Sequence, residues 1–305
     1  MKIGLPRAFL YHRYRYLWTE FFNLLGHETV VSPPTNKKIL ADGISASVDE
    51  SCLPGKIFLG HVAHLTDKCD YILIPRIASY GKNEKTCVKF NALYDVTSNT
   101  FEANFLHYNV DVLRGKSERR GFISLGKFLG HSIKESADVY DSALQAFLNS
   151  RRAEAIKEVK KFLSPALKIL LIGHAYNLHD ACVGAPAVRL LTNSGATVIY
   201  ADKLSGGRVC DNLRMPGLYW TFHKELLSAV QTFKHKADGL MFLTAFPCGP
   251  DALVYELTRR NLCDIPACNL IMDEHSGESG LETRVESFLD IVKSRRLKVK
   301  GEKQT

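Results

Sequence analysis

Three cysteines stand where a thiolate could do chemistry. Cys248 lies in TAFPCGPDALVYE, directly after an apolar run and directly before a helical pattern, and Cys52 in DESCLPGKI is also followed by x-Pro and a helical pattern. Proline fits the first turn of a helix, and a helix N-terminus stabilises a thiolate placed there. Cys87, in GKNEKTCVKF, lies in a polar segment after another apolar run. Thiolates from three separate loops could therefore meet at one site.

Such a site would suit a soft metal. Thiolates select zinc or iron–sulfur clusters, but the chain contains no C-x-x-C pair of the kind that metal fingers use. Buried structural cysteines are the alternative, and the residue pattern alone leaves both interpretations open. The other five cysteines, for which we predict no ligand role, are Cys69, Cys182, Cys210, Cys263 and Cys268.

The elements that must position these residues alternate between apolar strands and helical patterns. Most of the strands are continuously apolar, which is typical of a parallel sheet buried on both faces. The predicted strands are Lys2–Pro6, Glu28–Pro33, Asp70–Pro75, Lys168–Gly173, Ala196–Ala201, Asp238–Thr244 and Ala267–Asp273. The predicted helices are about Phe9–Leu25, Thr35–Ser47, Pro54–Leu65, Ala185–Asn193, Pro216–Phe233, Pro250–Asn261 and Leu281–Lys293. This alternation indicates an α/β fold.

The two halves of the chain repeat this order. Thr29 matches Thr197, and Asp70 before its strand matches Asp238 before its strand, at one constant offset. We therefore predict two Rossmann-like, doubly wound parallel-sheet domains, residues 1–155 and 156–305, with the boundary in the charged helical segment near 150–165. Ligands bind at the carboxyl ends of the strands in such sheets, so we expect the two domains to face a shared cleft.

Composition excludes several classes of protein. The chain has 305 residues, 46% of them hydrophobic, and a formal charge of +8 that is spread out. It shows no apolar run of membrane length, no signal-peptide pattern and no nucleic-acid module, so we expect a cytoplasmic protein with free thiols and no membrane or nucleic-acid partner. Neither glycine-rich phosphate signature is present, so no ATP site is expected. The basic run after Lys293 predicts a frayed tail.

Several longer motifs resemble one family. They are SPPTNKKIL (Ser32–Leu40), VDESCLPGK (Val48–Lys56), DYILIPRI (Asp70–Ile77), TCVKF (Thr86–Phe90), GHAYNLHD (Gly173–Asp180), FPCGPD (Phe246–Asp251) and DEHSGESGLETRVESF (Asp273–Phe288). In this order, over nearly the whole chain, they resemble the acyl-CoA dehydratase activase-related family, whose members are also called CoA protein activases. That family is related to the iron–sulfur subunits of 2-hydroxyacyl-CoA dehydratases and to double-cubane cluster proteins.

The resemblance implies a redox cofactor. It implies that Cys52, Cys87 and Cys248 ligate an iron–sulfur cluster, either a 4Fe-4S cubane or a double cubane, and three thiolates would leave one corner of a cubane open. It also implies an oxygen-poor metabolism, a separate ATP-dependent activator protein as electron donor, a paralogous subunit, a dimeric assembly and acyl-CoA as a candidate ligand. The chain departs from the family in having Val88, where the family usually has proline, and this change could loosen the Cys87 loop.

Other polar residues fall near the ends of predicted strands. Lys56 could hydrogen-bond a cluster sulfur or a CoA phosphate, but a surface lysine is the favoured interpretation. His174 and Asn177 follow the carboxyl end of a strand, so they could contact a cofactor or substrate, or they could cap a turn. The run Asp273–His275 offers acid–base groups, but a role in holding its own loop is favoured.

The sequence supports more than one class of function. The leading hypothesis is an iron–sulfur protein that accepts low-potential electrons, as a 2-hydroxyacyl-CoA dehydratase-like or double-cubane reductase component. No general base and no CoA pocket can be identified, so whether the chain is itself an enzyme is left open. The alternatives are a non-catalytic electron-transfer or scaffold subunit that works with a larger paralogue, and a protein whose thiolates hold zinc structurally.

Overall fold

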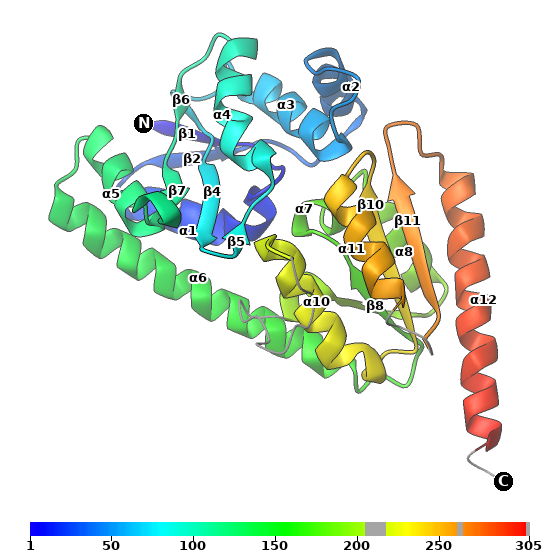
Figure 1. Ribbon diagram of the computed structural model, residues 1–305. Helices are drawn as coiled ribbons and strands as arrows, with labels where there is room; N and C mark the ends of the chain where they lie inside the picture. The colour runs from blue at the N-terminus through cyan, green and yellow to red at the C-terminus, as the bar shows by residue number, and fades with distance from the viewer. Residues whose placement is uncertain (205–217, 261–264, 303–305) are drawn as a thin grey trace. The chain divides into compact units, whose positions relative to one another are not determined.

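The computed structural model describes residues 1–204, 218–260 and 265–302 of the chain. They group into two compact units. Unit 1 comprises Met1–Arg151 and the described part of Arg214–Lys224, and unit 2 comprises the remaining described residues. The division falls within the 29-residue helix α6 (Ile133–Lys161) and again within α10 (Thr221–Phe233). Each unit contains its own four-stranded sheet (Figure 1).

The main sheet of unit 1 is parallel, with the strand order β2-β1-β3-β6. Its strands are β1 (Lys2–Leu5), β2 (Glu28–Val31), β3 (Tyr71–Leu73) and β6 (Phe105–Leu106). The helices of this unit that precede α6 are α1 (Tyr11–Leu24), α2 (Lys37–Ser45), α3 (Leu53–Leu65), α4 (Val88–Thr100) and α5 (Glu118–Phe128). This order places α2 and α3 between the second and third strands in sequence, and α4 between the third and fourth.

A second, smaller sheet in unit 1 was not predicted from the sequence. It has the order β5-β4-β7, with β4 (Arg76–Gly81) antiparallel to β5 (Glu84–Lys85) and parallel to β7 (Asn109–Asp111). A short 3-10 helix, Val112–Arg114, follows β7. These strands are short and polar, so they lack the continuous apolar run that marks the strands of the main sheet.

Unit 2 has a four-stranded parallel sheet with the order β9-β8-β10-β11. Its strands are β8 (Lys168–Ile172), β9 (Thr197–Tyr200), β10 (Gly239–Ala245) and β11 (Ala267–Met272). Its helical elements besides the parts of α6 and α10 are α7 (Ala175–Leu178), α8 (Ala185–Asn193), α9 (Ala201–Leu204), the 3-10 helix Lys234–Lys236, α11 (Gly249–Arg260) and α12 (Glu278–Glu302). Figure 1 shows α12 running beside β11.

The core of unit 1 follows from the pattern of α1. Its buried residues recur every three or four positions and are Tyr11, Tyr14, Leu17, Trp18, Phe21 and Phe22. This spacing gives the helix one apolar face. Burial of each large side chain stabilises the fold by about 1.5–3 kcal/mol relative to exposure.

Two glycines let α2 and α3 approach closely. A Cβ atom added to Gly43 would lie 1.9 Å from the carbonyl oxygen of Lys56, and one added to Gly60 would lie 1.9 Å from that of Ile39. Any side chain at either position would therefore push the two helices apart. This packing fixes the position of α3, whose first turn follows Cys52.

The structure confirms the α/β class, the two parallel sheets and all seven predicted strands within a residue or two. The shared cleft and the domain limits 1–155 and 156–305 stay predictions. Two expectations were wrong. The predicted frayed tail continues as α12 to Glu302, and the helix predicted from Pro216 begins at Thr221, with residues 216–217 outside the described chain. None of the described helices has the length and apolarity to cross a bilayer.

Candidate functional site

Two of the predicted ligands, Cys52 and Cys87, each precede a helix of unit 1. Cys52 is the N-cap of α3, and its carbonyl accepts hydrogen bonds from the N–H groups of Gly55 at 2.8 Å and Lys56 at 3.1 Å. Cys87 is the N-cap of α4, and its carbonyl accepts from the N–H of Phe90 at 3.0 Å. Neither thiol caps its own helix. Both sulfurs therefore stand at the positive end of a helix dipole.

The segment before Cys87 is anchored although Val88 replaces the family's proline. The N–H of Thr86 donates to the carbonyl of Ala78 at 3.1 Å, and its hydroxyl donates to the carbonyl of Ile77 at 2.5 Å. Cys87 is thus the cap of a helix that begins next to β4, where the sequence indicated only a polar loop. The bonds of Thr86 hold the loop that the missing proline was expected to loosen.

Phe9 packs between α3 and α4. Its ring centroid lies 5.6 Å from that of Phe58 in α3 and 5.2 Å from that of Phe90 in α4, edge to face in the second case. Its φ of 45° is in the left-handed region, which costs a non-glycine residue about 1–2 kcal/mol. The aromatic contacts of this buried side chain offset that strain and fix the relative position of the two helices.

The surroundings of the unit 1 thiols are positively charged. Neither α3 nor α4 has an acidic residue in its first turn. The Nζ of Lys89 and the Sγ of Cys52 both lie close to the point that a Cβ on Gly55 would occupy, at 3.5 and 3.6 Å, so they are at most about 7 Å apart. Lys56, in the first turn of α3, is only 3% exposed, so the interpretation as a surface lysine was wrong. Anionic sulfur is favoured in such a setting.

The third predicted ligand, Cys248, belongs to unit 2. It follows β10 and immediately precedes α11. Its N–H donates to the carbonyl of Ala245 at 3.0 Å, and its carbonyl accepts from the N–H of Ala252 at 3.1 Å. The predicted start of a helix at this thiol is therefore confirmed, and all three predicted ligands are helix-capping residues.

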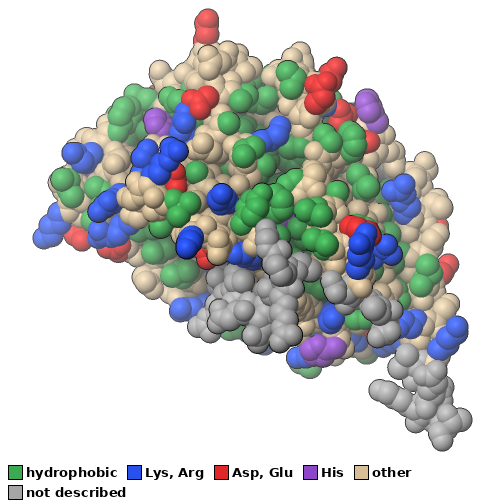
Figure 2. All heavy atoms as spheres, viewed as in Figure 1, with side chains coloured by type: hydrophobic (Ala, Val, Ile, Leu, Met, Phe, Trp, Pro, Cys, Tyr) green, Lys and Arg blue, Asp and Glu red, His purple; other side chains and the backbone are tan. Residues whose placement is uncertain are grey.

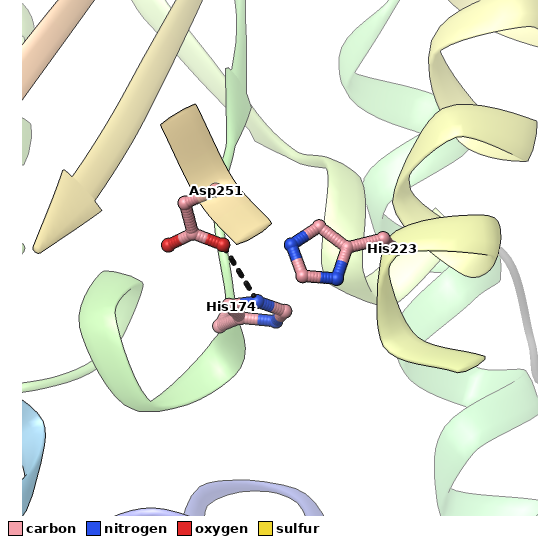
Figure 3. A group of neighbouring side chains, drawn as sticks. All are labelled: His174, His223 and Asp251. Atoms are coloured by element: carbon pink, nitrogen blue, oxygen red, sulfur yellow. Dashed lines mark ion pairs between the residues drawn. The ribbon is translucent and has the colours of Figure 1, made fainter. Parts of the chain in front are cut away.

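An ion pair lies beside Cys248 in unit 2. The Nε2 of His174 and the Oδ1 of Asp251 are 3.0 Å apart, and both side chains are buried (Figure 3). His174 caps α7 at the carboxyl end of β8, and Asp251 lies in the first turn of α11. The pair thus joins two of the family-like motifs, GHAYNLHD and FPCGPD. His223, also drawn in Figure 3, lies in the part of α10 that belongs to unit 1.

Asn177 is a buried amide without partners. Its side chain is fully buried, and neither Oδ1 nor Nδ2 makes a hydrogen bond to any described residue. Nearby Asp180, by contrast, is used structurally, because its Oδ1 accepts from the N–H groups of Cys182 at 2.8 Å and Val183 at 3.1 Å. An unpaired buried amide marks a place where a water or a ligand group completes the hydrogen bonds.

The sequence analysis missed a buried polar network behind the SPPT motif. The Nδ1 of His61 lies 2.8 Å from the hydroxyl of Ser32, and its Nε2 lies 3.0 Å from that of Thr35. Arg7 donates its backbone N–H to the Ser32 hydroxyl and its Nε to the Ser32 carbonyl. Burial, helped by the charge of Arg7, lowers the pKa of His61 to about 3. The only sequence signal was a histidine inside an apolar helix.

The acid–base candidates at Asp273–His275 hold their own loop. The Oδ1 of Asp273 accepts hydrogen bonds from the N–H of His275 at 2.8 Å and the hydroxyl of Ser276 at 2.9 Å. This is the structural role favoured from the sequence. A pocket of about 270 Å³ lies between this loop and the start of α12.

The cysteines for which no ligand role was predicted differ from the three helix-capping ones. The thiol of Cys69 donates to the carbonyl of Leu65 at 3.3 Å. Burial raises the pKa of Cys69, Cys182 and Cys268, so their neutral thiol is favoured. Cys210 and Cys263 lie outside the described residues.

The structure thus places Cys52 and Cys87 at the starts of α3 and α4 in unit 1, with Lys89 close to Cys52. In unit 2 it places Cys248 at the start of α11, the helix whose Asp251 contacts His174. Convergence of all three thiols on one metal stays a prediction.

Comparison with known proteins gives one family match. Residues 2–204, more than half of the chain, match the family model described as the CoA enzyme activase uncharacterised domain. A search of curated proteins found no match. Among solved structures, ZnuA is 11% identical, with 97% of this chain and 99% of that chain covered and a TM-score of 0.28. The SBP FpvC from Pseudomonas aeruginosa with Ni²⁺ is 12% identical, with 98% and 97% covered and a TM-score of 0.29. These TM-scores are too low to indicate a shared fold.

Proposed function

Because the chain belongs to the CoA enzyme activase uncharacterised domain family, we propose that it is an iron–sulfur protein whose cluster is held by Cys52, Cys87 and Cys248. The bound cluster would supply low-potential electron transfer, with electrons delivered by a separate ATP-hydrolysing activator protein. The observation that carries this proposal is that each of the three thiols immediately precedes a helix of 12 or 13 residues.

The chemistry of the donors fits such a group. Thiolates are the ligands that iron–sulfur clusters prefer. A cluster held by thiolates is anionic, and the positive ends of helices stabilise negative charge. In unit 1 the ammonium group of Lys89 adds to this field. In unit 2 the acid nearest to Cys248 in sequence, Asp251, is engaged by His174, whose Nε2 lies 3.0 Å from its Oδ1.

The remaining candidates would act as binding groups. Lys56, buried in the first turn of α3, would donate hydrogen bonds to the cluster or to an anionic ligand. His174 would hold Asp251 and so orient the first turn of α11. Asn177 would offer its unpaired amide to a bound ligand.

The proposed function requires partner proteins. We infer that the chain works in the cytoplasm with an ATP-dependent activator and a paralogous subunit, and that acyl-CoA is its candidate ligand. The resemblance to dehydratase subunits and the family name are what support these partners. The competing class of function is an electron-transfer subunit without its own substrate.

Anaerobic metal analysis tests the cluster. We expect near-equal iron and sulfide in protein that is purified or reconstituted without oxygen, with visible absorption and an EPR signal after reduction. Cys52→Ser, Cys87→Ser and Cys248→Ser should each lose or alter that signal. Cys69→Ser is the matched control, because a serine hydroxyl can also donate to the carbonyl of Leu65.

The outcomes separate the alternatives. Absence of iron after reconstitution would overturn the proposal, and so would an equal loss of signal in Cys69→Ser. Tightly held zinc that disappears in the three variants would support the structural zinc site instead. Turnover of an acyl-CoA by the chain with activator and reductant would identify an enzyme, whereas electron uptake without turnover would identify a transfer subunit.

A further inference from the structure

A second pocket lies in unit 1, apart from the cysteines. It has a volume of about 640 Å³ and is bordered by α4, α5 and the segment from β6 to β7. Small-molecule sites span about 300–1,000 Å³, so this pocket has the size of a ligand site. The lining includes Tyr94, Phe105, His107, Lys116, Arg120 and Phe128.

The floor of the pocket is apolar and rigid. Leu106, Tyr108 and Leu125 line it and are buried. Gly121 lets α5 lie directly on this floor, because an added Cβ would approach the Tyr108 ring to 3.1 Å. The hydroxyl of Tyr108 accepts a hydrogen bond from the indole N–H of Trp18 at 3.0 Å, which fixes the ring. The floor is therefore formed before any ligand arrives.

Aromatic side chains border this floor. The rings of Tyr94 and His107 lie 4.4 Å apart and are tilted by 51°, with Phe105 edge-on to Tyr94 at 6.4 Å. The guanidinium of Arg76 lies 5.0 Å from the centroid of the Tyr94 ring. Phe128, at the end of α5, is 60% exposed although it is large and apolar. Aromatic faces of this kind stack on planar ligands.

The polar border of the pocket is cationic. No carboxylate lines it, whereas Lys116 and Arg120 do. Among the described residues neither cation has a carboxylate partner. The guanidinium of Arg120 is held in place by a hydrogen bond to the carbonyl of Gly115 at 3.0 Å. Figure 2 shows Lys and Arg side chains gathered on the surface over α5.

Three acids that lie next to the pocket in sequence are engaged elsewhere. Asp95 pairs with Arg76. Asp111 accepts a hydrogen bond from the hydroxyl of Ser79 at 2.7 Å. Glu118 accepts one from Tyr140 at 3.0 Å. The positive charge of Lys116 and Arg120 is therefore not neutralised within the pocket, and an anionic ligand group would be favoured there.

We propose that this pocket binds a nucleoside phosphate, with the base on the aromatic and apolar part and the phosphate on Lys116 and Arg120. The volume exceeds the needs of a simple inorganic anion, and the separation of apolar floor from cationic border matches a base joined to a phosphate. The chain lacks both glycine-rich phosphate signatures, so the phosphate would be held by the side chains of Lys116 and Arg120 and not by a glycine-rich loop. The proposal does not depend on the iron–sulfur cluster.

Calorimetric titration with AMP, adenosine, inorganic phosphate and CoA tests the site. We expect AMP to bind at least about tenfold more tightly than adenosine or phosphate alone, because each lacks one half of the recognised group. If CoA binds about tenfold or more tighter than AMP, the nucleotide belongs to a coenzyme. If AMP binds as tightly as CoA, the ligand is a free nucleotide. Failure of both to bind would overturn the proposal.

Variants locate the binding. The double variant Lys116→Ala/Arg120→Ala should weaken AMP binding by at least about tenfold, through loss of two charge-assisted hydrogen bonds. Lys127→Ala is the control, because Lys127 is an exposed cation of the same helix that does not line the pocket. Tyr94→Ala should weaken AMP while leaving phosphate unchanged. Equal AMP affinity in the double variant and the wild type would contradict the site.

Two further measurements separate loss of nucleotide binding from misfolding and from loss of the cluster. Unchanged far-UV circular dichroism and tryptophan fluorescence would show that the double variant is folded. Cys248→Ser should retain full AMP affinity even where it loses iron, so failure of the cluster and failure of the nucleotide site are distinguishable.

Discussion

The two units share one strand topology but differ in the residues at the carboxyl ends of their strands. The sheet of unit 1 has the order β2-β1-β3-β6, and that of unit 2 has the order β9-β8-β10-β11, so in both the first strand lies between the second and the third. Both sheets are parallel throughout. The repeat found in the sequence is therefore a repeat of strand order.

The units also share a pair of hydrogen bonds, made by an aspartate, at the amino end of the sheet. In unit 1 the Oδ2 of Asp70 accepts a hydrogen bond from the N–H of Lys2 at 2.7 Å, and the N–H of Asp70 donates to the carbonyl of Lys2 at 2.9 Å. In unit 2 Asp238 and Lys168 make the same two bonds, each at 2.8 Å. Each aspartate clamps the start of the first strand to the start of the third.

The difference lies in how each unit holds its thiols. Cys87 and Cys248 are equivalent, because each precedes the helix that joins the third strand to the fourth. Unit 1 adds Cys52 and binds its two helix starts through the ring of Phe9, whereas unit 2 binds its one helix start through the ion pair of His174. Strand pairing therefore sets the scaffold of both units, whereas the residues that follow the strands decide which chemistry each unit can carry.

Loss of the Phe9 ring should have the largest effect. Phe9→Ala is expected to lower the free energy of unfolding of unit 1 by about 3–5 kcal/mol, because a buried ring is replaced by a cavity. Phe9→Gly should cost about 1 kcal/mol less, since glycine tolerates the positive φ. Urea unfolding followed by tryptophan fluorescence reports on unit 1, because Trp18 and Trp220 both belong to it.

The same variants probe the link to the thiols. Iron uptake on reconstitution should fall in Phe9→Ala, because α3 and α4 lose their common support. Unchanged stability in both variants would contradict the role of Phe9 in supporting α3 and α4 of unit 1.

Acid should destabilise unit 1 through His61. The pKa of His61 is about 3 in the folded state and 6.5 for a free side chain. Between these two pH values the side chain is protonated in the unfolded chain but neutral in the folded chain. Stability is lost as the pH falls, by about 2 kcal/mol at pH 5. His61→Asn should be less stable at pH 7 but should lose this part of the pH dependence. Equal slopes for wild type and variant between pH 7 and 5 would contradict the buried neutral state.

The two clamps should differ in strength. Asp238 is partly buried and also pairs with the Nζ of Lys168 at 3.3 Å, whereas Asp70 is exposed. Asp238→Ala is therefore expected to cost about 2 kcal/mol and Asp70→Ala less than about 1 kcal/mol, because water competes for exposed hydrogen bonds. Thermal unfolding of both variants, followed by far-UV circular dichroism, checks the order. A larger loss of stability for Asp70→Ala than for Asp238→Ala would contradict the role given to burial.

The scaffold was predictable because its signals are strong. A strand buried on both faces needs a continuous apolar run, and such runs gave the seven predicted strands, including Gly239–Ala245 with six of its seven residues buried. The second sheet of unit 1 was missed because β5 and β7 have only two and three residues, and because polar residues interrupt the apolar ones in β4, whose sequence is RIASYG. The missed helix α4 begins with no acidic residue in its first turn, so it lacks a common start signal.

The candidate site was predictable only in part. The helix starts at Cys52 and Cys248 follow from Cys-x-Pro, which is a local pattern. The support from Phe9, the network of His61 and the ion pair of His174 with Asp251 join residues that are distant in sequence. No local pattern marks such contacts, because each residue type also has an ordinary use in a core or a turn.

The unpaired amide of Asn177 gives the smallest expected effect and the sharpest test of unit 2. Asn177→Val introduces an apolar side chain only slightly larger than the amide and removes a buried polar group that lacks partners among the described residues. If nothing fills the site, the variant should be more stable by about 1 kcal/mol, because the desolvation cost disappears. If a ligand uses the amide, the variant should still gain stability alone but lose the stabilisation that acyl-CoA gives to the wild type in a thermal shift assay. A loss of stability without ligand would instead mean that the amide is hydrogen-bonded to an internal water, and Asn177 would then belong to the scaffold that both units share.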